Sequence, residues 1–184
     1  GPLWALHRLA YGYADHVLVT SKRMAADLDS HGIPNPWVWR RGVDVERFSP
    51  SYASDDMRQR LSDGHTDRTL LLSVGRLAPE KQVEQIRHVL DAVPNVHLAI
   101  VGDGPHRKAL ETHYAGYPVT FVGYMTGHEL SVAYASADLF VFPSSSIATF
   151  GLFAAASMAS GVPVVPSRVR WMPAITANGA HRSL

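Results

Sequence analysis

The chain of 184 residues contains no cysteine. Disulfide bonds, thiolate metal sites and thiol nucleophiles are therefore excluded, and the composition agrees with a reducing compartment. No apolar run approaches the roughly 18 residues of a membrane-spanning helix, and the first residues, interrupted by His7 and Arg8, do not resemble a secretory signal. Lys and Arg number 17 against 16 Asp and Glu, which gives no net drive toward nucleic acid. We expect a protein that is not secreted, with one domain or one domain and a piece of another.

Acidic residues are absent from the whole stretch between Leu139 and Leu184. Within it, FPSSSIATFGLFAAASMASG (residues 142–161) predicts the end of a buried strand, a polar loop and an alanine-rich helix. A junction of this kind can hold a phosphate, because the first N–H groups of a helix have no partner within the helix. Thr149 can cap the helix and leave the N–H groups of Gly151 and Leu152 for an anion. The alternative is that Thr149 and water satisfy these groups.

Strands alternate with helices from about residue 68 onward. Strands are predicted at 69–75, 96–102, 119–123, 138–143 and 162–167, and helices at 80–93, 105–116, 127–137 and 150–160. Continuous apolar runs are typical of parallel strands that are buried on both faces. Together with the right-handed crossover rule, this pattern favours an α/β fold with a doubly wound, parallel, Rossmann-like sheet.

The first part of the chain has a different organisation. A helix, a strand, a second helix and a second strand are predicted at 2–13, 16–20, 21–32 and from 37 onward, with Ser21 and Gly32 as start and stop of the second helix. We interpret the chain as the remnant of a preceding domain with its connection, a linker with a short helix, and a Rossmann-like domain, at residues 1–50, 51–67 and 68–184.

Two cationic residues follow the first predicted strand of the Rossmann-like domain. Ligands of open α/β sheets bind at the carboxyl ends of the strands. Arg76 follows Gly75 at the end of the strand, and Lys81 opens the next predicted helix. A planar arginine fork and a mobile lysine charge suit a diphosphate. The alternative, two solvated loop residues, fits the spacing equally well.

The next two strand ends are less specific. Gly102-Asp103-Gly104 has only part of a dinucleotide fingerprint, because Arg107 stands where a third glycine belongs, and a tight turn before a helix is favoured. After the third strand, a plain turn at 123–125 is favoured over contact with a base. A Rossmann dehydrogenase is disfavoured, since a ribose-binding acid is also missing.

The ten histidines do not indicate a metal site. His106 and His113 can share a helix face, but no carboxylate partner or i,i+4 spacing supports metal binding. We therefore expect exposed histidines, no metal and no cofactor. The serines at 144–146 lack the glycine frame of a nucleophile elbow, so a loop is favoured there over hydrolase chemistry.

Five stretches occur in an order that is typical of one enzyme family. They are RGVDVERFSP, SVGRLAPEK, AIVGDGP, FVGYMTGHELSVAYASADLFVFPS, and TFG followed by MASGVPVV. Between residues 2 and 167 the chain resembles the C-terminal half of retaining GT-B glycosyltransferases, and within them the sulfoquinovosyltransferases of plants and algae. That resemblance implies two Rossmann-like domains around the active site and a UDP-sugar-dependent hexosyltransferase. It implies transfer of sulfoquinovose from UDP-sulfoquinovose to diacylglycerol, peripheral membrane association of the full-length enzyme, and a plastid location; otherwise we expect a cytoplasmic protein.

The resemblance also assigns roles to residues. Arg76 and Lys81 match the pair that binds the diphosphate and stabilises the departing UDP. No general base is identifiable in the sequence. The nucleotide-sugar site implied by the resemblance comprises Gly75, Gly102, Gly123, Tyr124, Met125, Thr149, Phe150, Gly151 and Leu152, with Gly123 to Met125 at the base and 150–152 under the phosphates.

Two glutamates of the family are missing from this chain. They fall on Ala148 and Ala156, where the first would contact the transferred sugar and the second the ribose hydroxyls. Losing one charged hydrogen bond costs about 1.5–3 kcal/mol. A glycine pair of the family falls on Arg170 and Trp171, whose bulk obstructs close backbone approach, and a further acid falls on Ala174. We therefore expect a fragment that is inactive alone. The alternatives are a non-catalytic nucleotide- or partner-binding module and a fold-only remnant without ligand.

Overall fold

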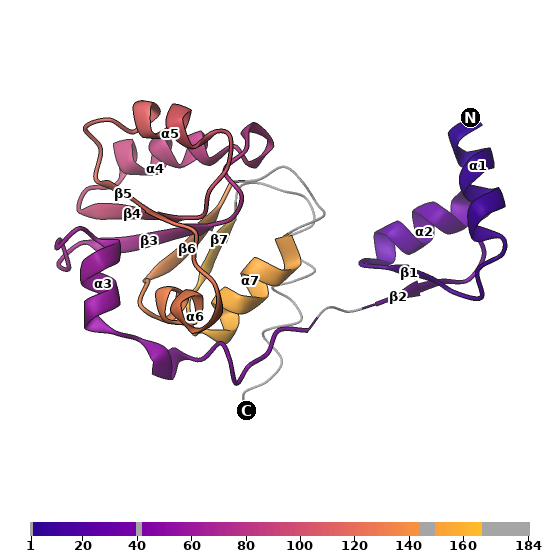
Figure 1. Cartoon of the computed structure of the whole chain (residues 1–184), viewed down its shortest axis with the longest axis horizontal. Helices are drawn as coiled ribbons and strands as arrows, with labels where there is room; N and C mark the ends of the chain where they lie inside the picture. The colour runs from indigo at the N-terminus through magenta and orange to yellow at the C-terminus, as the bar shows by residue number, and fades with distance from the viewer. Residues whose placement is uncertain (1, 40–41, 144–149, 167–184) are drawn as a thin grey trace. The chain divides into compact units, whose positions relative to one another are not determined.

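The computed structural model describes residues 2–39, 42–143 and 150–166. The chain forms two compact units, Gly1–Gly42 and Val43–Leu184 (Figure 1). The first contains α1 (Pro2–Tyr11), β1 (Val17–Val19), α2 (Lys22–Ser30) and β2 (Pro36–Val38), and β1 and β2 pair in parallel. The Ser21 hydroxyl accepts a hydrogen bond from the Met24 N–H, which caps α2 as predicted.

The second unit is built on a five-stranded parallel sheet. The strands are β3 (Thr69–Val74), β4 (Val96–Val101), β5 (Val119–Gly123), β6 (Leu139–Phe142) and β7 (Val164–Pro166). Their order in the sheet is β5-β4-β3-β6-β7, and every pair is parallel. The five predicted strands and the doubly wound topology are confirmed.

Helices cover both faces of this sheet (Figure 1). The helices α4 (Arg87–Ala92) and α5 (Arg107–His113) lie on one face. On the other lie α3 (Asp55–Leu61), α6 (Gly127–Ala135) and α7 (Phe150–Ala159). Side chains of β3 alternate between the two layers: Leu70 and Leu72 join the apolar cluster beneath α6 and α7, and Leu71 joins the cluster beneath α5. This two-sided burial explains why the strands are continuous apolar runs.

The helix predicted at 80–93 is wrong in its first half. Two short 3₁₀ helices, η2 (Pro79–Lys81) and η3 (Val83–Ile86), precede α4, and Gln82 between them is left-handed with φ 51°. The buried Tyr114 hydroxyl donates a 2.7 Å hydrogen bond to the Val83 carbonyl. In a continuous α-helix that carbonyl would accept the Arg87 N–H, which instead bonds to the Glu84 carbonyl, so the tertiary contact competes with regular helix formation.

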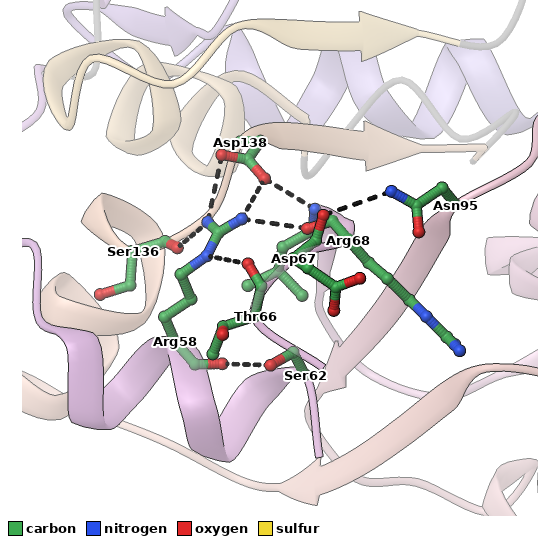
Figure 2. Close-up of polar contacts among 9 residues, drawn as sticks. Arg58, Ser62, Thr66, Asp67, Arg68, Asn95, Ser136 and Asp138 are labelled. Atoms are coloured by element: carbon green, nitrogen blue, oxygen red, sulfur yellow. Dashed lines mark hydrogen bonds and ion pairs between the residues drawn. The ribbon is translucent and has the colours of Figure 1, made fainter. Parts of the chain in front are cut away.

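Residues 43–67 fold as part of the second unit, although the sequence suggests a connection and a linker there. They contain η1 (Pro50–Tyr52) and α3, which begins where the Ser54 hydroxyl accepts a hydrogen bond from the Met57 N–H. Figure 2 shows what fastens α3: the Arg58 guanidinium donates to both carboxylate oxygens of Asp138, at 3.1 and 2.8 Å. It also donates to the backbone carbonyls of Thr66, Arg68 and Ser136. The segment is therefore held to the sheet by specific polar contacts.

The expectation of exposed histidines is wrong for His97. This residue lies on β4, is 2% exposed, and its Nε2 lies 2.8 Å from the Thr120 hydroxyl of β5. Burial, with smaller contributions from Arg68 and His65, lowers the pKa of His97 to about 4. The ring is therefore neutral in the folded protein at neutral pH.

We expect the free energy of unfolding to fall as the pH drops from about 6.5 to 4, because the unfolded chain then binds a proton that folded His97 excludes. The limiting slope for one group is about 1.4 kcal/mol per pH unit. Urea denaturation across this range should show a smaller slope in His97→Gln, which can still bond to Thr120. His88→Gln is the control, since His88 is exposed. Equal slopes in wild type and His97→Gln would contradict the assignment.

Candidate functional site

The reversal of strand order marks the place where a ligand is expected. The chain winds outward from β3 to β4 and β5, then returns to β6 on the other side of β3. In open α/β sheets the crevice at such a switch point, outside the carboxyl ends of the strands, is the binding site. Gly75 and Arg76 leave β3 at this point, and β6 ends beside it in Phe142 and Pro143.

Three of the predicted site glycines form a row across this edge of the sheet. The Gly75 N–H donates to the Val101 carbonyl at 3.0 Å, and the Gly102 N–H donates to the Gly123 carbonyl at 2.7 Å. Gly102 has φ +139°, and a Cβ atom there would lie 1.9 Å from the Gly75 carbonyl oxygen. Only glycine allows the ends of β3 and β4 to approach this closely. The row therefore carries no side chains at this edge, with Gly75 and Gly123 partly exposed and Gly102 buried between them.

The two predicted cations both follow β3. Arg76 is exposed, and Lys81 is half-buried at the end of η2. The expectation that Lys81 opens an α-helix is wrong, because η2 has three residues and Gln82 interrupts the backbone after it. An anion at this position would be bound by the side-chain charges, without the dipole of a long helix.

The third strand end combines an exposed aromatic ring with buried support. Gly123 has φ +82°, Tyr124 is 76% exposed, and Met125 is 3% exposed within the core cluster of α6 and α7. The Met125 side chain is therefore occupied by packing, and this stretch can offer a ligand its backbone and the Tyr124 ring. Contact with a base stays a prediction.

Two of the predicted site positions, Leu152 and Ala156, have described side chains in α7. Leu152 is 43% exposed, whereas Ala156 is 4% exposed and packs in the cluster that contains Phe140 and Tyr134. The Ala156 side chain is therefore part of the hydrophobic core. Phe150 and Gly151 begin α7. Thr149, Ala148, Arg170, Trp171 and Ala174 lie outside the described residues.

A hollow of about 530 Å³ lies at the opposite edge of the sheet, at the amino ends of β4 and β5. Arg68, Pro94, Asn95 and Tyr117 are among the residues that line it. Arg68 is the residue before β3, and Arg76 is the second residue after it. The two cations therefore lie at opposite ends of this strand. Strand polarity favours the Arg76 edge as the ligand site.

Sequence reasoning missed the position of Arg107. It treated this residue only as an obstacle to the dinucleotide fingerprint, whereas in the structure Nη1 of Arg107 lies 3.8 Å from the Cβ position of Gly123. Nε of Arg107 donates to Oε1 of Glu111 at 2.8 Å. The i,i+4 spacing of Arg107 and Glu111 is visible in the sequence and predicts this pair, but not its place beside the third strand end.

Two negative findings apply to residues 2–39, 42–143 and 150–166. No three His, Asp or Glu side chains there gather in a way that could hold a metal ion. None of the helices in the same ranges has the length and apolar character needed to cross a bilayer.

Comparisons with known proteins give the family. The sequence pattern of the glycosyl transferases group 1 matches residues 56–184. The chain is 41% identical over 177 residues to sulfoquinovosyl transferase SQD2 of Arabidopsis thaliana, covering 95% of this chain and 34% of that protein. It is also 41% identical over 163 residues to a GDP-mannose-dependent alpha-mannosyltransferase of Mycolicibacterium smegmatis, covering 88% of this chain and 42% of that protein.

Solved structures agree with the fold. The Anabaena protein HepE, solved with UDP and glucose, matches with a TM-score of 0.74 at 23% identity over 90% of this chain and 48% of that one. The sucrose-phosphate synthase of Thermosynechococcus elongatus matches with a TM-score of 0.72 at 28% identity, over 92% of this chain and 44% of that one. The chain thus spans less than half of the relatives that it matches, and it belongs to the glycosyl transferases group 1 family.

Proposed function

We propose that the unit Val43–Leu184 binds the nucleotide of a UDP-sugar at the carboxyl edge of its sheet, as the donor-binding domain of a hexosyltransferase. The observation that carries this proposal is the glycine row at the switch point, with Arg76 and Lys81 at its β3 end. The absence of side chains along the row leaves room for a diphosphate, and the side chains of Arg76 and Lys81 supply the opposite charge. The HepE structures, which contain UDP or UDP-glucose, support the choice of uridine.

The residues perform one chemical task in this proposal. When the sugar is transferred, negative charge develops on the departing diphosphate, and Arg76 and Lys81 offset that charge. This is transition-state stabilisation, because the charge on the leaving group grows along the reaction. No cofactor takes part in this proposal.

The finer proposal is transfer of sulfoquinovose to diacylglycerol in plastids, with the full-length protein associated peripherally with the membrane. Its support is the match to SQD2 over 95% of this chain. The chain is also 41% identical to a GDP-mannose-dependent alpha-mannosyltransferase. Its relatives therefore differ in the base and in the sugar of the donor. Ala148 and Ala156 replace the two family glutamates, and we propose that the chain alone does not catalyse transfer. Turnover of UDP-sulfoquinovose and diacylglycerol by the purified chain would contradict this.

A calorimetric titration with UDP tests the nucleotide site. We expect wild type to bind UDP and Arg76→Ala and Lys81→Ala to bind it roughly 10- to 150-fold more weakly, the loss of one charged hydrogen bond each. Arg68→Ala is the matched control, since it removes the same charge at the other end of β3 and leaves the proposed site unchanged.

The possible outcomes separate the candidate functions. UDP binding that weakens in both site variants without any transfer activity fits a non-catalytic nucleotide-binding module as well as a donor domain awaiting its partner domain. Weakening by Arg68→Ala alone would move the nucleotide to the opposite edge and contradict the proposed site. A folded wild-type chain that binds no UDP would favour the fold-only remnant.

A further inference from the structure

We propose that Arg107 recognises the base of the bound nucleotide and favours bases with an exocyclic carbonyl, uracil and guanine, over bases with an amino group at that position, cytosine and adenine. The inference rests on the proposed function, because it takes the diphosphate to lie at Arg76 and Lys81. It concerns a residue that the resemblance does not assign to the site.

The length of the glycine row fits a nucleotide. Gly75 and Gly102 follow β3 and β4, and Gly123 is the last residue of β5. Because these three strands are adjacent, the row spans two interstrand spacings, about 10 Å. In a nucleoside diphosphate the ribose separates the base from the diphosphate. A diphosphate at Arg76 therefore allows the base to reach Gly123, where the 76% exposed Tyr124 ring offers an apolar surface for it.

The Arg107 guanidinium is held at this end of the row. Its Nε donates to Oε1 of Glu111 at 2.8 Å, and its Nη1 lies 4.0 Å from Oδ2 of Asp103. Nη1 also lies 3.8 Å from the position that a Cβ atom would occupy on Gly123. The side chain is 33% exposed, so part of the fork faces solvent beside open backbone. Among the described residues, the Nη2 group has no hydrogen-bond partner.

The chemistry of the guanidinium gives the direction of the preference. Arginine carries only donors, so it pairs with an acceptor and is repelled by another donor. Uracil presents O4 and guanine presents O6, whereas cytosine and adenine present amino groups at the corresponding positions. Because Glu111 holds Nε, the fork is already oriented, and less rotamer entropy is lost when a base binds.

Calorimetric titration with UDP, CDP and inorganic pyrophosphate tests this role. We expect wild type to bind UDP roughly 10-fold more tightly than CDP, the discrimination of one good pairing. Arg107→Gln should bring the two affinities within about twofold of each other and leave pyrophosphate binding unchanged. Lys108→Gln is the control, because it removes a positive charge from the next, exposed position of α5. GDP and ADP form a second matched pair with the same expected ratio.

A second variant keeps the test independent of folding. In Arg107→Lys the single ammonium can pair with Glu111 and preserve α5, but it leaves no oriented fork for the base, so the UDP-to-CDP ratio should again fall. A purely structural role of Arg107 would lower thermal stability and leave that ratio unchanged, which would overturn the inference.

Two further outcomes would also overturn it. An equal loss of affinity for UDP, CDP and pyrophosphate in Arg107→Gln would place Arg107 at the phosphates. A wild-type chain that binds none of the nucleotides would overturn both this inference and the proposed function. Binding with an unaltered base preference would overturn the inference alone.

Discussion

Gly102→Ala is expected to lower the free energy of unfolding by about 4 kcal/mol, the sum of backbone strain and overpacking. The new methyl group would lie 1.9 Å from the Gly75 carbonyl oxygen, and φ +139° is a conformation that L-residues avoid. The ends of β3 and β4 must separate to relieve the contact. Because Arg76 follows Gly75 directly, UDP binding should weaken in any molecules that remain folded.

The control for this substitution is Gly116→Ala. Gly116 also has positive φ, +82°, but nothing lies within 4 Å of its Cβ position. It should lose only the cost of the left-handed backbone, about 1 kcal/mol. Urea denaturation of both variants separates the steric term from the backbone term. Equal losses in the two variants would show that the strand ends do not approach each other as closely as the structure indicates.

The second large effect concerns the Arg58–Asp138 pair. Arg58→Met should cost about 2–3 kcal/mol, because it removes five hydrogen bonds and leaves the Asp138 carboxylate with the Leu70 N–H alone. This value is below that of a fully buried pair, since the two side chains are 25% and 42% exposed. Arg60→Met is the control on the same helix. Arg60 pairs with Glu129 at the surface, with 52% and 44% exposure, and should cost at most about 0.5 kcal/mol.

The pH dependence of this pair has a definite sign. Partial burial opposes the charge of Asp138, but the hydrogen bonds from Arg58 and the Leu70 N–H, with the Arg58 charge, outweigh it and lower the pKa of Asp138. A lowered folded-state pKa stabilises the protein above the unfolded value, about 3.9, and this contribution is lost as the pH falls through the folded value. The difference in stability between wild type and Arg58→Met should therefore shrink below about pH 4. A constant difference down to pH 2 would contradict the ion pair.

The sequence was most informative where burial determines local structure. The apolar runs of β3 and β4 are buried on both faces, and this pattern, with the alternation of strands and helices, predicts a doubly wound parallel sheet without giving the order of its strands. The helix prediction failed at 80–86, because the Tyr114 hydroxyl donates a hydrogen bond to the Val83 carbonyl, 31 positions away in the chain. Helix periodicity cannot indicate a competitor so distant in the chain.

Only part of the candidate site could be predicted from the sequence. Glycines at strand ends can be recognised one by one, but their alignment into a row depends on strand order, which gives Gly75 and Gly123 their places on either side of Gly102. His97 was assigned to the surface, since the sequence of β4 does not reveal that the His97 ring will meet the Thr120 hydroxyl of β5. Arg107 reaches Gly123 only because β4 and β5 are neighbours.

The central claim is that a nucleotide binds at the carboxyl edge of this sheet. Chemical-shift mapping of the labelled chain during titration with UDP tests it most directly. We expect the amide signals of Gly75, Gly102 and Gly123 to shift, and those of Thr66 and Asn95 at the amino edge to stay unchanged. Shifts confined to the amino edge, or none in a folded chain, would contradict the proposed site.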